Sequence, residues 1–214
     1  AAAMQVQQLD FLMLTLGTAY VFEEIDNNQA VANCHKLPAD RFRRRRLSIT
    51  EVVNTLSEAI QIIWVARPEV QVVLTVSPVR HLRDGVVENQ RSKSCLILAV
   101  EELCKNLTGV HYFPAYELLL DDLRDYRFYD RDLVHPSEEA IDYIKEKFQQ
   151  NYFSEAALKL SKRIEKINRA LAHRPLFPST QAHRDSQKKL LVKIETMEKE
   201  HPYLDFSTEK KSLT

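Results

Sequence analysis

An aspartate and a histidine lie three positions apart in the segment 130–136, which reads DRDLVHP. Asp132 and His135 stand on a loop that enters a helix, since Pro136 is tolerated in the first helical turn. A carboxylate at this spacing can accept a hydrogen bond from one imidazole nitrogen while the other nitrogen reaches a nucleophile, as in a hydrolytic triad. On spacing alone, the alternative that both are surface or helix-capping residues is favoured, because such residues are frequent near helix starts.

The composition bounds the classes of protein that could carry this pair. The chain has 214 residues, which suits one compact domain with a short appendage. Lys plus Arg and Asp plus Glu both total 30, and this balance argues against a dedicated nucleic-acid binder. No apolar run approaches the roughly 18 residues of a membrane span, and three glycines are too few for a glycine-rich phosphate loop. The three scattered cysteines predict no disulfide framework and no metal site, and they fit a reducing compartment.

Three short runs predict the strands of a sheet. Residues 9–16, 70–76 and 110–113 are rich in apolar or β-branched residues, and the first two read as fully buried strands. Helices are predicted between and after these runs, so strands and helices alternate along the chain. This order is typical of an α/β protein with a parallel sheet and right-handed crossovers.

The predicted helices of this domain have recognisable starts. The capping box formed by Ser48 and Glu51 begins one helix, and Ser137 begins the helix that follows the Asp132–His135 loop. A third helix is expected along residues 96–107, after a polar loop at 79–91.

Beyond about residue 152 the pattern changes to amphipathic helices without strands. We therefore expect two parts, an α/β domain at 1–152 and a helical extension at 153–214 packed on it. Pro175 and Pro178 are expected to interrupt the two helices of the extension.

Residues 21–50 lack a period and contain the run RFRRRR at 41–46. Such a run could bind phosphate or an anionic polysaccharide. The alternative is a solvated loop neutralised by nearby acids, for which Glu23, Glu24 and Asp26 are available, and the balanced net charge favours this reading.

Ligands of open parallel sheets bind beyond the carboxyl ends of the strands. Three segments fall there in the predicted order: 17–20 after the first strand, 77–81 after the second, and 130–136 before the last helix of the sheet domain. Gly17, Arg80 and His81 are therefore candidates for contact with a ligand, together with the Asp132–His135 pair. A purely local hydrogen-bonding role for His81 is the alternative.

Several stretches together carry a resemblance to a known family. They are TLGTAYVFE (15–23), VANCHK (31–36), TVSPVRHLRDGVVENQ (75–90), YFPAYELLLDDLRDYRFY (112–129) and DLVHPSEEAIDYI (132–144), with weaker likeness at HRPLFP (173–178) and YLDFSTE (203–209). With them the chain resembles the GSCFA family, a branch of the SGNH (GDSL-like) hydrolase superfamily. The resemblance implies a three-layer α/β/α fold, of SGNH or flavodoxin-like type, and the hydrolysis of an ester or acyl group without a cofactor. It implies that His135 is the general base and Asp132 its orienting acid.

Two departures from the family pattern limit this reading. The superfamily's Gly-x-Asn-Asp block aligns with residues 17–20, where Ala19 replaces the asparagine that donates to the oxyanion. Loss of one such donor slows a hydrolase by roughly 10² to 10³, and Asn33 is a candidate substitute, with a turn-supporting role as the equal alternative. The family's Gly-Ser-Cys-Phe-Ala segment, which holds the nucleophile, has no counterpart here, and Ser77 and Ser137 read as turn and cap residues.

The sequence therefore predicts a bacterial-type serine hydrolase fragment that begins downstream of its nucleophile strand. The strand at 9–16 would then be an unpaired edge, and the chain would be silent alone or associated with a separate N-terminal segment. We expect a small-molecule ester or an acylated carbohydrate as substrate, with no nucleic acid and no membrane as partner. The absence of a signal peptide from these residues suggests a cytoplasmic location, a reading that depends on what precedes Ala1. A non-catalytic interaction module with the same fold is the competing prediction.

Overall fold

The computed structural model describes residues 9–32, 34, 36–172 and 180–213. The chain divides into two compact units, Ala1–Phe148 and Gln149–Thr214, and each is described by itself. The predicted residue Asn33 and the two prolines Pro175 and Pro178 lie outside the described residues.

The first unit contains a parallel sheet of three strands. These are β1 (Phe11–Leu16), β5 (Gln71–Val76) and β6 (Val110–Phe113), in the order β1-β5-β6. Thr15 pairs with Thr75 in the first ladder, and Thr75 pairs with Phe113 in the second. The predicted parallel α/β arrangement is confirmed, because each pair of strands is joined by a crossover that contains a helix.

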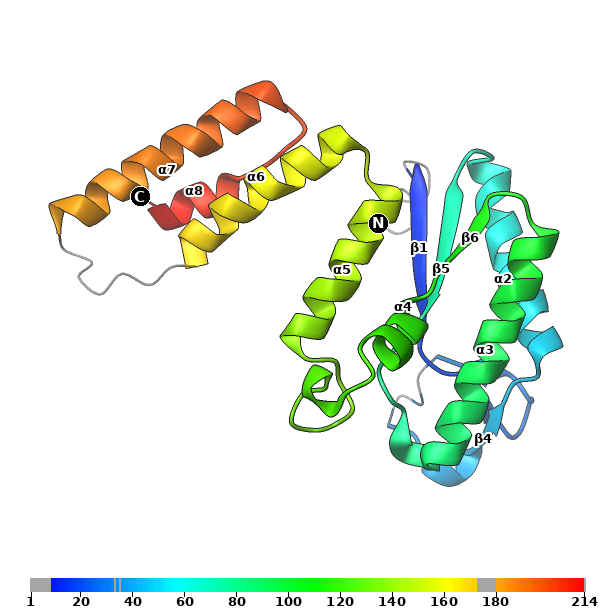
Figure 1. The fold of residues 1–214 in the computed structure, drawn as a ribbon. Coiled ribbons are helices and arrows are strands. Elements are labelled where there is room, and N and C mark those ends of the chain that lie inside the picture. The colour runs from blue at the N-terminus through cyan, green and yellow to red at the C-terminus, as the bar shows by residue number, and fades with distance from the viewer. Residues whose placement is uncertain (1–8, 33, 35, 173–179, 214) are drawn as a thin grey trace. The chain divides into compact units, whose positions relative to one another are not determined.

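Helices cover both faces of this sheet (Figure 1). The helices α2 (Ile49–Ala66) and α3 (Val86–Asn106) pack on one face, where Val72 and Leu74 of β5 meet Ile60 and Val100. The helix α5 (Glu138–Tyr152) lies on the other face, and the ring of Phe148 meets the ring of Phe113 edge-on with centroids 5.1 Å apart. The capping box at the start of α2 is formed as predicted. The unit is thus a three-layer α/β/α structure.

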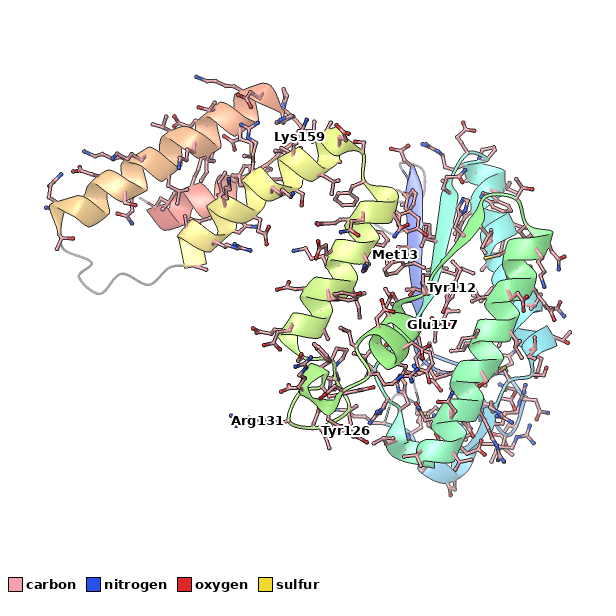
Figure 2. All side chains as sticks on the ribbon, viewed as in Figure 1. Met13, Tyr112, Glu117, Tyr126, Arg131 and Lys159 are labelled. Atoms are coloured by element: carbon pink, nitrogen blue, oxygen red, sulfur yellow. The ribbon has the colours of Figure 1, made fainter. Side chains whose placement is uncertain are left out.

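The first strand is less buried than its sequence predicts. Phe11 and Met13 remain 44% and 45% exposed, and burial alternates along β1. Within the described residues β1 pairs only with β5, so it is an edge strand of the sheet. Met13 lies on the side of β1 that faces α5 (Figure 2).

A second sheet follows β1, in a region whose sequence shows no period. The antiparallel strands β2 (Tyr20–Glu24), β3 (Ala30–Val31) and β4 (Phe42–Arg46) form it in the order β3-β2-β4, and a 3-10 turn, η1 (Ala39–Arg41), precedes β4. The prediction of a loop at the arginine run was wrong, because the run is a strand. Its register sets Arg43 opposite Glu23, so the pairing of charges across the strands compensates for the missing apolar alternation.

The predicted polar loop at 79–91 is shorter in the structure. A 3-10 turn, η2 (Leu82–Asp84), leads into α3, which begins at Val86 with Gly85 as its N-cap. The start was predicted too late because the first turns of α3 bury polar residues, which carry no apolar periodicity. Gly85 has a φ of +88°, a conformation that glycine adopts without a steric penalty.

The segment between β6 and α5 consists of short helical turns. They are α4 (Ala115–Glu117), the π-helical turn η3 (Leu118–Asp122) and the 3-10 turn η4 (Tyr126–Phe128). Residues 115–122 are thus a composite of one α-helical and one π-helical turn. Ser137 receives the N–H of Ala140 at 3.4 Å, in keeping with its predicted capping role.

The second unit is helical. It contains α6 (Glu155–Ala172), α7 (Gln181–Glu200) and the unpredicted α8 (Ser207–Leu213). Its small core consists of buried side chains from α6, α7 and the turn before α8: Ile167, Leu190, Ile194, Met197 and Phe206. Among the described residues of the chain, no helix combines the length and apolar character that a membrane crossing requires.

Candidate active site

The side chains of Asp132 and His135 are in direct contact. Nδ1 of His135 lies 2.6 Å from Oδ2 of Asp132, while Oδ1 accepts the backbone N–H groups of Val134 and His135 at 2.8 and 3.0 Å. Leu133 between them has a φ of +57°, and this tight turn brings the imidazole back over the carboxylate. The local backbone and the imidazole thus hold the carboxylate from two sides.

The hydrogen bonds of this turn also keep the carboxylate charged. The backbone N–H of His135 is the strongest influence, followed by its imidazole and the N–H of Val134, and together they lower the pKa of Asp132 to about 2. The two side chains are half exposed, at 60% for His135 and 48% for Asp132. Because the bond to Asp132 occupies Nδ1, Nε2 is the nitrogen through which the ring can exchange a proton with a ligand.

Arg80 connects this turn to the sheet. Its backbone N–H donates to the carbonyl of Val134 at 3.2 Å, and its guanidinium donates to the carbonyl of Leu133 at 3.2 Å. The guanidinium also lies 4.3 Å from the centre of the Tyr129 ring. Arg80 follows β5 by a few residues, so these contacts hold the Asp132–His135 turn at the carboxyl end of the parallel sheet.

A small pocket of about 190 Å³ lies beside Arg80. It is lined by side chains of the segment that precedes the Asp132–His135 turn, among them Tyr126 and Tyr129. Tyr126 and Arg131 project from that segment in Figure 2. Arg80 therefore borders both the catalytic candidates and a cavity of a size suited to a small substituent.

Gly17 and His81 form a second cluster at the ends of β1 and β5. A Cβ atom on Gly17 would lie 3.1 Å from Nε2 of His81, so the ring rests directly on the glycine. The backbone N–H of His81 donates to Oδ1 of Asn89 at 2.8 Å. Burial chiefly lowers the pKa of His81, and the positive charges of Lys93 and Arg44 lower it further. This imidazole is therefore biased toward its neutral form.

The structure places the first cluster (Asp132, His135, Arg80) and the second (Gly17, His81) at the same edge of the sheet. Among the described residues no hydrogen bond is found between Gly17 or His81 and the Asp132–His135 pair, and the backbone step from Arg80 to His81 connects the clusters. Among all residues that the structure describes, no group of three or more His, Cys, Asp or Glu side chains is arranged to hold a metal ion.

Ala19 does not occupy a position from which a side chain could donate to a substrate. It is 1% exposed and belongs to the core cluster with Val52 and Val76. Its backbone N–H donates to Oγ of Ser92 at 2.7 Å. An asparagine side chain at this position would enter the apolar core.

Sequence reasoning missed three buried polar residues of α3 beside these clusters. They are Asn89, Ser92 and Lys93. Their spacing places them on one helical face, which the apolar stripe of Leu96 and Ala99 continues. The sequence does carry a signal for them: these polar residues continue the apolar stripe of the helix toward its N-terminus. Such a position predicts burial, and a buried polar side chain requires hydrogen-bond partners.

The arginines of the run 41–46 are neutralised by carboxylates. Arg41 pairs with Glu24 at 2.7 Å and Arg43 with Glu23 at 2.8 Å, two of the acids expected to do so. Glu23 also pairs with Arg45 at 2.6 Å, and the other pairs involve acids from other elements: Arg44–Asp84, Arg45–Glu51 and, more distantly, Arg46–Glu88. In the described residues Asp26 is not among these partners. The paired guanidinium groups support the neutralised reading of the run over anion binding.

Fold and site together define an α/β protein with an exposed histidine–aspartate pair at the carboxyl edge of a parallel sheet. The GSCFA family matches residues 1–148, and residues 164–214 match the GSCFA domain protein, C-terminal domain. The chain therefore belongs to the GSCFA family. No curated protein and no solved structure matches it.

Proposed function

We propose that this chain is the histidine–aspartate portion of an SGNH-type serine hydrolase that acts on ester bonds. The observation that carries the proposal is the 2.6 Å bond between Nδ1 of His135 and Asp132, at the carboxyl edge of the sheet. A histidine held in this way adopts one tautomer and can transfer a proton only through Nε2. The fold and the GSCFA membership are compatible with this activity.

In the proposed reaction a serine hydroxyl attacks the carbonyl carbon of the ester. His135 takes the hydroxyl proton on Nε2 and later gives it to the leaving alcohol, and Asp132 stabilises the imidazolium in between. Water then attacks the acyl-enzyme with the same base, releasing the acid and restoring the serine. Gly17 is proposed to supply a backbone donor to the oxyanion, and Asn33 and His81 are further candidates for this substrate contact.

The serine is proposed to come from a segment that precedes Ala1. Ser77 and Ser137 already serve as local caps: Oγ of Ser77 accepts the N–H of Val79 at 3.2 Å, and Oγ of Ser137 donates to Glu139 at 3.0 Å. A nucleophile-bearing strand would extend the sheet at the outer edge of β1, and without that strand residues 1–214 would be silent.

An apolar cavity next to Pro136, on the sheet face that α5 covers, is proposed to take part of the missing segment. The cavity has a volume of about 350 Å³ and lies between the exposed side of β1 and α5. Met13 and Ile141, half exposed or nearly so, line it together with Pro136, which follows His135 directly. A segment packed here would bury this apolar surface and bring a side chain near the imidazole.

A small-molecule ester or an acylated carbohydrate is the proposed substrate class, which follows from the resemblance to ester hydrolases. A non-catalytic module is the second candidate function, and the core position of Ala19 favours it, since one expected oxyanion donor is lost.

Ester turnover by a longer polypeptide distinguishes the two candidates. The proposal predicts no turnover of a chromogenic acetate ester by residues 1–214 and turnover by a longer polypeptide that includes the residues encoded before Ala1. His135→Ala should abolish the latter, while His111→Ala, whose ring instead binds Gln71 at 3.0 Å, serves as the matched control. Equal turnover in the His135→Ala variant would overturn the hydrolase.

A further inference from the structure

The buried face of α3 carries polar side chains close to the carboxyl ends of β1 and β5. Asn89 is 8% exposed, Ser92 is 2% exposed and Lys93 is fully buried. Buried polar groups are costly unless they are hydrogen-bonded, and a fully buried lysine is rare in folded proteins. Each of these side chains therefore requires partners in the interior.

Lys93 bonds to the ends of two neighbouring strands. Its Nζ donates to the carbonyl oxygen of Gly17 and to that of Ser77, both at 2.6 Å. Gly17 and Ser77 are the first residues after β1 and β5, which are adjacent in the sheet. A single amino group thus joins the two strand ends.

The other two polar side chains fix the residues that follow. Oγ of Ser92 lies 3.0 Å from Oγ1 of Thr18 and accepts the N–H of Ala19 at 2.7 Å. Asn89 accepts the N–H of His81 at 2.8 Å. The backbone on both sides of the contact between Gly17 and His81 is therefore anchored to one helical face.

The bond to Lys93 also orients the peptide after β1. The carbonyl of a trans peptide points opposite to its N–H group, and the described residues contain no cis peptide bond. Because the carbonyl of Gly17 points to the buried Nζ, the N–H of Thr18 points away from Lys93. Lys93 of α3 consequently determines the direction of the Thr18 N–H, the one donor of the peptide between Gly17 and Thr18.

We infer that Lys93 is a positioning residue, whose buried amino group sets the placement of Gly17 against His81 at the ends of β1 and β5. The functional meaning of this placement rests on the proposed hydrolase, in which these two residues contact the substrate. The placement itself does not depend on catalysis. Burial lowers the pKa of Lys93 to about 8, so the amino group begins to lose its proton close to neutral pH.

Glycine-selective NMR of the whole chain tests this inference. The chain contains only three glycines, Gly17, Gly85 and Gly109, so ¹⁵N-glycine labelling gives three resolvable amide signals. Lys93→Met should shift and broaden the Gly17 signal and displace the ring signals of His81, while the Gly109 signal stays in place. Lys93→Gln, which keeps donors and removes the charge, should return the Gly17 signal toward its wild-type position.

A matched surface variant controls for general effects of removing a lysine from α3. Lys105 lies on the same helix and pairs with Glu101 at 2.6 Å, so Lys105→Met should leave all three glycine signals unchanged. The inference is overturned if folded Lys93→Met keeps the Gly17 and His81 signals at their wild-type positions, or if Gly109 shifts as much as Gly17.

Two further arms keep the test decisive. If Lys93→Met does not fold, Lys93→Ala is read by the same criteria, because it also removes the amino group that bonds to the carbonyls of Gly17 and Ser77. A longer polypeptide without any ester turnover refutes the proposed function, whereas unchanged Gly17 and His81 signals refute the role of Lys93. The two failures are therefore distinguishable.

Discussion

The carboxylate of Asp132 binds the backbone N–H of His135 with one oxygen and the imidazole of the same residue with the other. The distances are 3.0 Å to the backbone nitrogen and 2.6 Å to Nδ1. One side chain thus holds both ends of its partner, and the ring cannot rotate without breaking a charge-assisted hydrogen bond. The Asp132 carboxylate in this loop therefore determines the tautomer of His135, with the proton on Nδ1.

Replacing Asp132 by asparagine tests that dependence. Asp132→Asn retains a side chain of similar shape but places an amide opposite Nδ1, so the preference for a proton on Nδ1 should be lost. ¹⁵N NMR of the ring reports the tautomer directly. In a hydrolytically competent form, kcat should fall on the order of 10⁴, as it does when a triad aspartate is lost. A ring that keeps its tautomer in the variant would contradict the assigned role.

The lowered pKa of Asp132 predicts a particular behaviour in acid. The group is ionised in the folded state down to a pH of about 2, whereas its ordinary pKa is 3.8. Its contribution to stability is therefore complete above the unfolded value and lost as the pH falls toward 2. A ¹³C titration of the carboxyl should give a midpoint well below 3.8. A midpoint at the ordinary value would show that the turn is not formed in solution.

The lowered pKa of Lys93 predicts a gain in stability in alkali. Its folded pKa of about 8 lies below its ordinary value of 10.5, so the unfolded chain binds more protons between these values. Stability should therefore rise as the pH increases through this window, by at most about 1.4 kcal/mol for each pKa unit. Urea unfolding of the wild type and of Lys93→Met at pH values of about 8 and about 10 isolates this effect. Parallel changes in both proteins would contradict it.

The contact between Gly17 and His81 predicts a steric effect of a single methyl group. Gly17→Ala places Cβ 3.1 Å from Nε2 of His81, so the ring must move and its NMR signals should shift. Overpacking of this kind costs roughly 1 to 3 kcal/mol. Gly85→Ala is the matched control, because it meets nothing within 4 Å and is strained only by its φ of +88°. It should lower the thermal midpoint without moving His81.

The sequence predicted the parallel sheet because its strands are distinct in composition. The runs that became β5 and β6 are continuous and β-branched or apolar, and the capping box Ser48–Glu51 marks the start of α2 by residue type alone. The burial of β1 was overestimated, since composition does not reveal which strand lies at an edge.

Elements that are stabilised by polar contacts could not be predicted from the periodicity of apolar residues. The arginine strand β4 is stabilised by pairing with β2 and by ion pairs with distant residues such as Asp84, which no local pattern encodes. The start of α3 was hidden for the same reason, because Ser92 and Lys93 occupy core positions. The spacing of Asp132 and His135 was visible in the sequence, but the turn at Leu133 that joins their side chains was not.

Covalent trapping with a serine-directed fluorophosphonate tests the proposed hydrolase most directly. Residues 1–214 should remain unlabelled, and a polypeptide that also includes the residues encoded before Ala1 should be labelled at one serine, with labelling lost in His135→Ala and retained in His111→Ala. Labelling that is absent from the longer form, or that persists at the same rate without the His135 imidazole, would contradict the account.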